Sequence, residues 1–144
     1  MKTCRTLRSL HLVLGLLTVS AAAWADVVVI VNPRSQAATM TAEQVSGIFL
    51  GKTPTLPSGA TAAMVDQPES NPLYERFYRG VSGKTPAQVK AVWSRLTFSG
   101  KAVPPLSLAS SAEVKKFVAA NPDAIGYIDR ADLDATVKVV LRLD

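Results

Sequence analysis

The strongest constraint on the fold is an unbroken run of β-branched apolar residues, Val27–Val31. Such side chains favour extended backbone, and a run without polar residues has no face that it can turn to water. The pattern is typical of a strand that is buried on both faces, in a sheet that helices cover. Asn32 and Pro33 end the run, since proline has no amide hydrogen to donate to a strand ladder. The run therefore predicts a helix-covered sheet.

Helical and extended patterns alternate along the rest of the chain. Thr41 stands three residues before Gln44, which is the spacing of a capping box, and it predicts a helix over residues 42–50. Further helices are predicted over residues 71–81, 86–98 and from 110 or 111 to 120, and further strands over 60–65, 124–129 and 136–143. Because helices and strands interleave, we predict an α/β fold with one mixed or mostly parallel sheet and helices on both faces.

The first 25 residues have the pattern of a cleavable export signal. Three basic residues and no acidic one precede an apolar run over residues 12–23, and the run leads to an Ala-x-Ala sequence that ends at Ala25. The run is shorter than the roughly 20 residues that a transmembrane helix needs. We therefore predict a signal peptide over residues 1–25, one periplasmic domain over residues 26–144, and no membrane span in the mature chain.

Composition restricts the chemistry of the predicted mature chain. Cys4 and His11, the only cysteine and histidine, both lie in the predicted signal. This excludes disulfides, thiol nucleophiles, histidine-based triads and the usual structural zinc sites from residues 26–144. Three of the 16 basic residues and none of the 11 acidic ones lie in the signal, which leaves 13 basic against 11 acidic residues, a net charge of +2. We predict no nucleic-acid binding, no catalysis, no cofactor and no metal.

Two further groups of residues have spacings that occur in binding sites. Asp129, Asp132 and Asp134 are close in sequence, but the glycine and the closing glutamate of an EF-hand loop are missing, so a solvated connection is expected. The aromatic residues recur at near-helical spacings, and we expect most of them to pack in the core or at the edge of the domain rather than to stack on a sugar. These four are Tyr74, Tyr78, Trp93 and Phe98.

The loop after the second predicted strand is the strongest candidate site. Residues 66–71 would follow a strand and open a helix, so that the amides and the positive dipole end of that helix point outward. Ser70 can cap the helix and offer a hydroxyl to a bound anion, and Asn71 and Thr41 also stand at predicted helix starts. An aspartate and a glutamate in the loop place negative charge beside such a site, so a solvated capping loop that binds nothing fits the same residues.

Several segments in order resemble the phosphate-binding periplasmic proteins of ABC transporters. They are Val29–Pro33, Ile48–Lys52, Ala63–Phe77 and Asn121–Ile128, and the segment Trp93–Lys101 is similar to short, single-lobe relatives of that family. The resemblance implies one lobe of a type II periplasmic-binding fold. It also implies a non-catalytic protein that binds a solute, with a small anion such as phosphate as the inherited ligand.

Two departures from the family's pattern matter for function. A full member of the family has two lobes that close on the ligand, so one lobe would need a second copy or another protein to bury it. The family's anion loop runs Arg-x-Asp-Gly-Ser-Gly-Thr, whereas residues 66–72 read Asp-Gln-Pro-Glu-Ser-Asn-Pro and agree only at Ser70. Asp66 replaces the arginine, and Pro72 has no amide hydrogen to donate. The alternative function is a protein-interaction module on the same fold that has lost phosphate binding.

Overall fold

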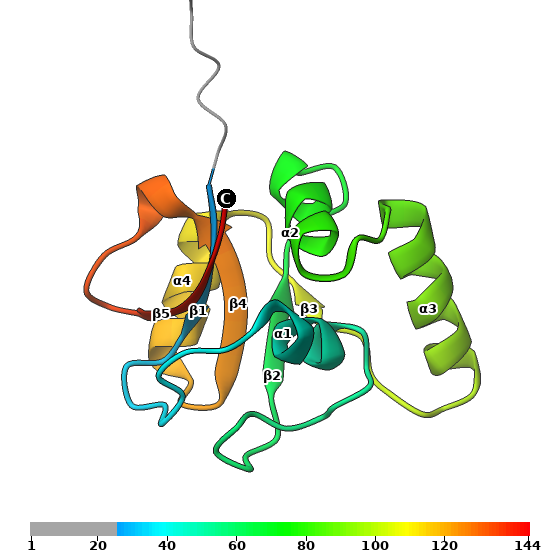
Figure 1. The fold of residues 1–144 in the computed structure, drawn as a ribbon, viewed down its shortest axis with the longest axis horizontal. Coiled ribbons are helices and arrows are strands. Elements are labelled where there is room, and N and C mark those ends of the chain that lie inside the picture. Colours follow the sequence, from blue (N-terminus) through cyan, green and yellow to red (C-terminus); the bar gives the residue numbers. More distant parts are fainter. Residues whose placement is uncertain (1–25) are drawn as a thin grey trace, which may run out of the picture.

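The computed structural model describes residues 26–144, and the predicted signal peptide lies outside this range. The strands are β1 (Val27–Val31), β2 (Ala63–Asp66), β3 (Leu106–Ser107), β4 (Ala124–Asp129) and β5 (Lys138–Leu143) (Figure 1). The helices are α1 (Ala42–Phe49), α2 (Pro72–Ser82), α3 (Pro86–Phe98) and α4 (Ser111–Ala120), with a short 3-10 helix at Arg130–Asp132. Helices and strands interleave, as the sequence predicts.

The strands form one sheet in the order β3-β2-β4-β1-β5. β2 runs parallel to both β3 and β4, whereas β1 pairs antiparallel with β4 and with β5. The sheet is therefore mixed, which confirms the predicted α/β class. The β-branched run of β1 lies inside the sheet with a partner on each side, and all five of its residues are buried.

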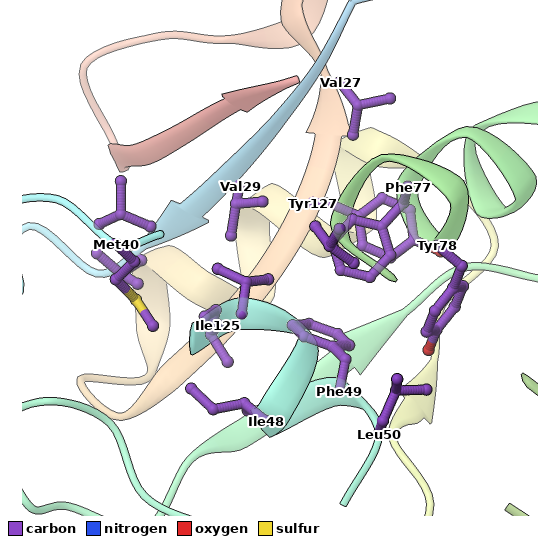
Figure 2. Packing of buried hydrophobic residues seen from close by; sticks show 14 of the residues in the cluster. Val27, Val29, Met40, Ile48, Phe49, Leu50, Phe77, Tyr78, Ile125 and Tyr127 are labelled. Carbon is purple, nitrogen blue, oxygen red and sulfur yellow. The ribbon is translucent and has the colours of Figure 1, made fainter. Parts of the chain in front are cut away.

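Helices cover both faces of the sheet, which the double-sided burial of β1 requires. Val27, Val29 and Val31 face a cluster that α1, α2 and α3 complete, and part of this cluster is shown in Figure 2. Val28 and Ile30 face the opposite side, where α4 packs. Within the larger cluster, Phe77 stacks on Tyr127 with ring centroids 4.0 Å apart, and Phe49 meets Phe77 edge-on at 4.8 Å. The core therefore has two layers with the sheet between them.

Two capping boxes fix the starts of α1 and α3. Thr41 Oγ1 accepts a hydrogen bond from the amide of Gln44 at 3.1 Å, and Gln44 Oε1 accepts one from the amide of Thr41 at 2.9 Å. Thr85 and Gln88 repeat this arrangement at α3. Trp93 Nε1 donates to the carbonyl of Phe49 at 3.0 Å, and this bond ties α3 to the end of α1. The predicted capping box at Thr41 is confirmed.

The main differences from the prediction lie in β2, in β3 and at the start of β5, and the helix ends shift by at most one residue. β2 begins at Ala63 rather than at residue 60, because Thr61 bridges back to Thr55 and the amide of Ala62 donates to Pro54. β3 was not predicted, because its two residues are exposed and form a strand only through pairing with β2. The last strand begins at residue 138, two residues after the predicted start.

Candidate functional site at the carboxyl end of β2

The candidate site lies where two neighbouring parallel strands send the chain to opposite faces of the sheet. β2 leads through residues 66–71 into α2 on one face, and β3 leads through residues 108–110 into α4 on the other. In open α/β sheets, a crevice forms at such a switch point, beyond the carboxyl ends of the strands, and ligands bind there. The β2–α2 loop that the sequence singles out is one wall of this crevice.

Asp66 is the last residue of β2 and leads into the loop, and its carboxylate points into the protein. It is 7% exposed, and Tyr78 Oη donates to its Oδ2 at 2.6 Å. The hydroxyl of Tyr127 donates to Oδ1, as does the amide of Gln67 at 2.8 Å. Burial raises the pKa of Asp66, and the two tyrosine hydroxyls oppose this shift because they favour the charged form. The carboxylate of Asp66 is thus held inward by the two tyrosines, and Glu69 is the exposed acidic residue of the loop.

Gln67 continues the buried part of the loop and is 1% exposed. Its Nε2 donates to the carbonyl of Tyr127 at 2.9 Å and to Ser111 Oγ at 3.4 Å, and its Oε1 accepts from Asn71 Nδ2 at 2.7 Å. The side chain thus joins β2 to β4, to the start of α4 and to the start of α2. The interpretation of residues 66–71 as a solvated loop is wrong for Asp66 and Gln67, and the exposed residues are Glu69 and Ser70.

The structure separates the three predicted site residues. Asn71, not Ser70, caps α2: its Oδ1 accepts from the amide of Leu73 at 3.0 Å, and Pro72 is the first residue of the helix. Both ends of the Asn71 amide group are therefore occupied within the protein. Ser70 is exposed, and Thr41 caps α1. Of the three, Asn71 alone lines either of the two described hollows beside the loop.

One hollow lies between the starts of α2 and α4, and we call it the cap pocket. Its volume is about 430 Å³. Its lining comprises Asn71, Pro72, Leu73, Arg76, Ser110, Ser111, Ala112, Asp129 and Asp132. Ser110 caps α4 by accepting from the amide of Glu113, and within residues 26–144 the amides of Ser111 and Ala112 have no acceptor. The cap pocket therefore combines first-turn amides of one helix, two serine hydroxyls and the Arg76 guanidinium with two carboxylates.

The second hollow lies on the other side of the loop, and we call it the α3 groove. It has a volume of about 650 Å³ between α3, the β2–α2 loop and the segment before β3. Aromatic and proline side chains dominate its walls, in particular Tyr74, Trp93, Phe98, Pro104 and Pro105. Burial raises the pKa of Tyr74 to about 12, with the negative charges of Asp66 and Glu69 adding to the shift. Phe98 is 96% exposed, so it is the exception among the four aromatic residues, most of which were expected to pack in the core or at the edge of the domain.

Apart from Asn71, sequence reasoning missed the polar residues that line the cap pocket. Arg76 follows Pro72 by four positions, so both lie on the same face of α2, and this spacing was an available signal. Ser110 and Ser111 stand at the predicted start of the helix that ends at residue 120, and nothing in the sequence marks them as pocket residues. Among residues 26–144 no group of three or more His, Cys, Asp or Glu side chains is placed to hold a metal ion. In the same range, no helix combines the length and the apolar character that crossing a membrane requires.

Solved structures of phosphate transport proteins share this fold. A protein described as a phosphate ABC transporter substrate-binding protein from Clostridium perfringens, with bound phosphate, aligns with a TM-score of 0.65 at 20% identity, over 81% of this chain and 45% of its own. An ABC-type phosphate transport receptor from Vibrio cholerae aligns with a TM-score of 0.61 at 20% identity, over 81% and 46%. PstS from Borrelia burgdorferi gives 0.61 at 15% identity, over 81% and 47%.

The similarity establishes the fold of this chain and shows how much of each larger protein the chain matches. The chain spans less than half of the length of each of these three proteins. The predicted resemblance to one lobe of the phosphate-binding fold is confirmed at the level of structure. No protein-family model and no curated protein matches the sequence.

Proposed function

We propose that residues 26–144 form a non-catalytic binding module that works in the periplasm and takes a small anion into the cap pocket. The observation that carries the proposal is the convergence of two helix starts, at Asn71 and Ser110, on a hollow that Arg76 also lines. The solved structures of this fold are described as proteins of phosphate transport, which supports an anionic ligand.

The donors of the cap pocket suit a tetrahedral anion or a carboxylate. Helix starts carry a partial positive charge, and the amides of Ser111 and Ala112, which have no acceptor within residues 26–144, are donors at the start of α4. The Arg76 guanidinium adds a full positive charge with several N–H groups. α2 contributes less, because Pro72 has no amide hydrogen and Asn71 already binds the amide of Leu73. We therefore assign the main share of anion binding to α4 and Arg76.

Two carboxylates set the selectivity of the proposed site. Asp129 and Asp132 line the same pocket and repel a fully ionised dianion. A carboxylate can accept a hydrogen bond from a ligand that keeps an acidic proton or a hydroxyl group. The ligand class is therefore hydrogenphosphate or a hydroxy acid, in preference to sulfate.

Isothermal titration of the domain with phosphate, sulfate and small carboxylates tests the proposal. We expect phosphate to bind and sulfate to bind more weakly, and we expect Arg76→Gln to weaken phosphate binding by about tenfold or more. Arg79→Gln is the matched control, since Arg79 lies on the same helix, pairs with Glu75 and does not line the cap pocket. Absence of heat with every anion at millimolar concentration, or equal binding by the Arg76→Gln variant, would contradict the proposal.

The second candidate function is a protein-interaction module that has lost solute binding. The exposed aromatic side chain of Phe98 and the apolar walls of the α3 groove favour it, because apolar surface of this kind marks contact sites on soluble proteins. The titration separates the two candidates, since an interaction module gives no heat with anions. The shape and charge of the α3 groove indicate which partner such a module would bind.

A further inference from the structure

The most exposed large apolar side chains of the described residues are concentrated in one segment. Phe98, Val103 and Leu106 are 96%, 81% and 49% exposed, and they follow one another between the end of α3 and β3. Leu106 belongs to the edge strand of the sheet. Single exposed apolar residues are common on soluble proteins, but a cluster of this kind beside a hollow marks a contact surface.

The same segment forms one side of the α3 groove, so that a protruding side chain and a hollow lie next to each other. Phe98 ends α3 and lines the groove together with Pro104 and Pro105, and Tyr74 and Trp93 complete the apolar walls. Trp93 is fixed by its hydrogen bond to the carbonyl of Phe49. The groove is therefore a preformed, largely apolar hollow, and the chain itself carries an aromatic side chain to fill it.

Charges of opposite sign lie on opposite walls of the groove. Glu69 belongs to the β2–α2 loop, and Lys90 belongs to α3. When two copies meet about a twofold axis that runs along the groove, the wall of Glu69 faces the wall of Lys90 in the other copy. An anionic lipid surface fits less well, because the exposed Glu69 is part of the lining.

We propose that two copies of this chain pack their α3 grooves together about a twofold axis, with Phe98 of each copy seated in the groove of the other. The contact is isologous and closes on itself, because the protruding side chain and the hollow belong to the same surface. Glu69 and Lys90 pair twice across the interface and set its register. The proposal goes beyond anion binding and does not depend on it.

The size of this surface limits the affinity. A buried aromatic side chain removes about 150–250 Å² from water, so two Phe98 side chains supply roughly 300–500 Å² of the 1,200–2,000 Å² that stable interfaces bury. The rest comes from Val103, the prolines and the groove walls. We therefore expect a reversible dimer with a dissociation constant on the order of micromolar.

Sedimentation velocity of residues 26–144 over a range from about 1 to 500 μM tests the proposal. We expect a monomer–dimer equilibrium in the wild type and at least a tenfold higher dissociation constant for Phe98→Asp. Ala120→Asp, an exposed position on α4 at the opposite face of the sheet, is the control and should dimerise like the wild type. Glu69→Lys and Lys90→Glu should each weaken the dimer, and the double variant should restore it.

Three results would overturn the proposal. The first is a wild-type protein that stays monomeric over the whole range. The second is a dimer that the Phe98→Asp variant retains, with circular dichroism confirming that both proteins are folded. The third is a monomer that co-sediments with vesicles of anionic phospholipid and loses this property in Phe98→Asp, because the segment would then dock on a membrane surface.

Discussion

Replacement of Tyr78 by phenylalanine isolates the buried carboxylate contact at the head of the candidate site. The substitution removes one oxygen, which donates to Asp66 Oδ2 at 2.6 Å, and it leaves the ring in contact with Phe49, Phe77 and Tyr74. Tyr78 is fully buried and Asp66 is 7% exposed, so water does not readily replace the lost donor. The change therefore measures one hydrogen bond with little change in packing.

The surroundings of Asp66 determine how much stability the Tyr78→Phe substitution removes. Within residues 26–144, the Asp66 carboxylate accepts from three donors, namely the hydroxyls of Tyr78 and Tyr127 and the amide of Gln67. This arrangement suits the ionised form, because an ionised carboxylate accepts hydrogen bonds and donates none. A hydrogen bond to a charged group contributes about 1.5–3 kcal/mol, against about 0.5–1.5 kcal/mol for a neutral pair. We expect Tyr78→Phe to lower the free energy of unfolding by about 2 kcal/mol at neutral pH.

The pH dependence gives a second, independent signature. Burial raises the pKa of Asp66 above its unfolded value of 3.8, so the folded state holds the proton more tightly. The contribution of this group to stability is then complete below pH 3.8 and is lost as the pH rises through the folded pKa. Removing a donor raises the folded pKa further and steepens this loss. The difference between the wild type and Tyr78→Phe should therefore shrink at acid pH, where the carboxyl is neutral.

Urea unfolding followed by circular dichroism, at neutral pH and near pH 3, measures both effects. With an m-value of about 2 kcal/mol/M for a domain of this size, the expected loss moves the midpoint by about 1 M urea at neutral pH. Tyr74→Phe is the matched control, because Tyr74 lies on the same helix, contacts Tyr78 and is only partly buried. The reasoning fails if Tyr78→Phe costs no more than Tyr74→Phe, or if its cost is the same at both pH values.

Two further changes test the packing behind the site and the electrostatics of the surface. Gly126→Ala should lower the free energy of unfolding by about 1–3 kcal/mol in thermal denaturation, because the added Cβ would lie 2.7 Å from Val114 Cγ1. Asp134→Asn should flatten the loss of stability as the pH falls from about 4 to about 2, because hydrogen bonds from Lys115 and Thr136 lower the pKa of Asp134 to about 2. The unfolding midpoint measured as a function of pH tests the Asp134→Asn prediction. The pH dependence is opposite to that of Asp66, because the pKa of Asp134 is lowered and that of Asp66 is raised.

The fold was largely predictable because its strongest signals are local. The β-branched run of β1 and the capping box at Thr41 depend on neighbouring residues alone, and both form as predicted. β3 depends on a distant partner, since its exposed Leu106 and Ser107 become a strand only beside β2. Local sequence patterns predict burial and helix capping, but they do not predict that a short exposed segment pairs with a strand far away in the sequence.

Of the three predicted site residues, the candidate site includes only Asn71. The choice between Ser70 and Asn71 as the cap of α2 was decided by Pro72, because proline fits best as the first helical residue and places the cap directly before itself. The burial of Asp66 was not predictable from the loop, since it depends on Tyr78 and Tyr127, which lie 12 and 61 residues away. A polar residue after a strand suggests solvent unless its distant partners are known.

The buried carboxylate of Asp66 explains why we place the anion at the start of α4 and not at the β2–α2 loop. In the resembled family an arginine occupies this point of the loop, whereas here the carboxylate is bound by two tyrosine hydroxyls that pack in the core beside Phe49 and Phe77. The loop is thereby held against β4, and Gln67 carries the same anchorage to Ser111 at the start of α4. Anion donors on α4 and at Arg76, in place of donors on the β2–α2 loop, are compatible with the same fold. Titration of the Arg76→Gln variant therefore also tests whether the α4 side of the crevice can bind an anion without an arginine at position 66.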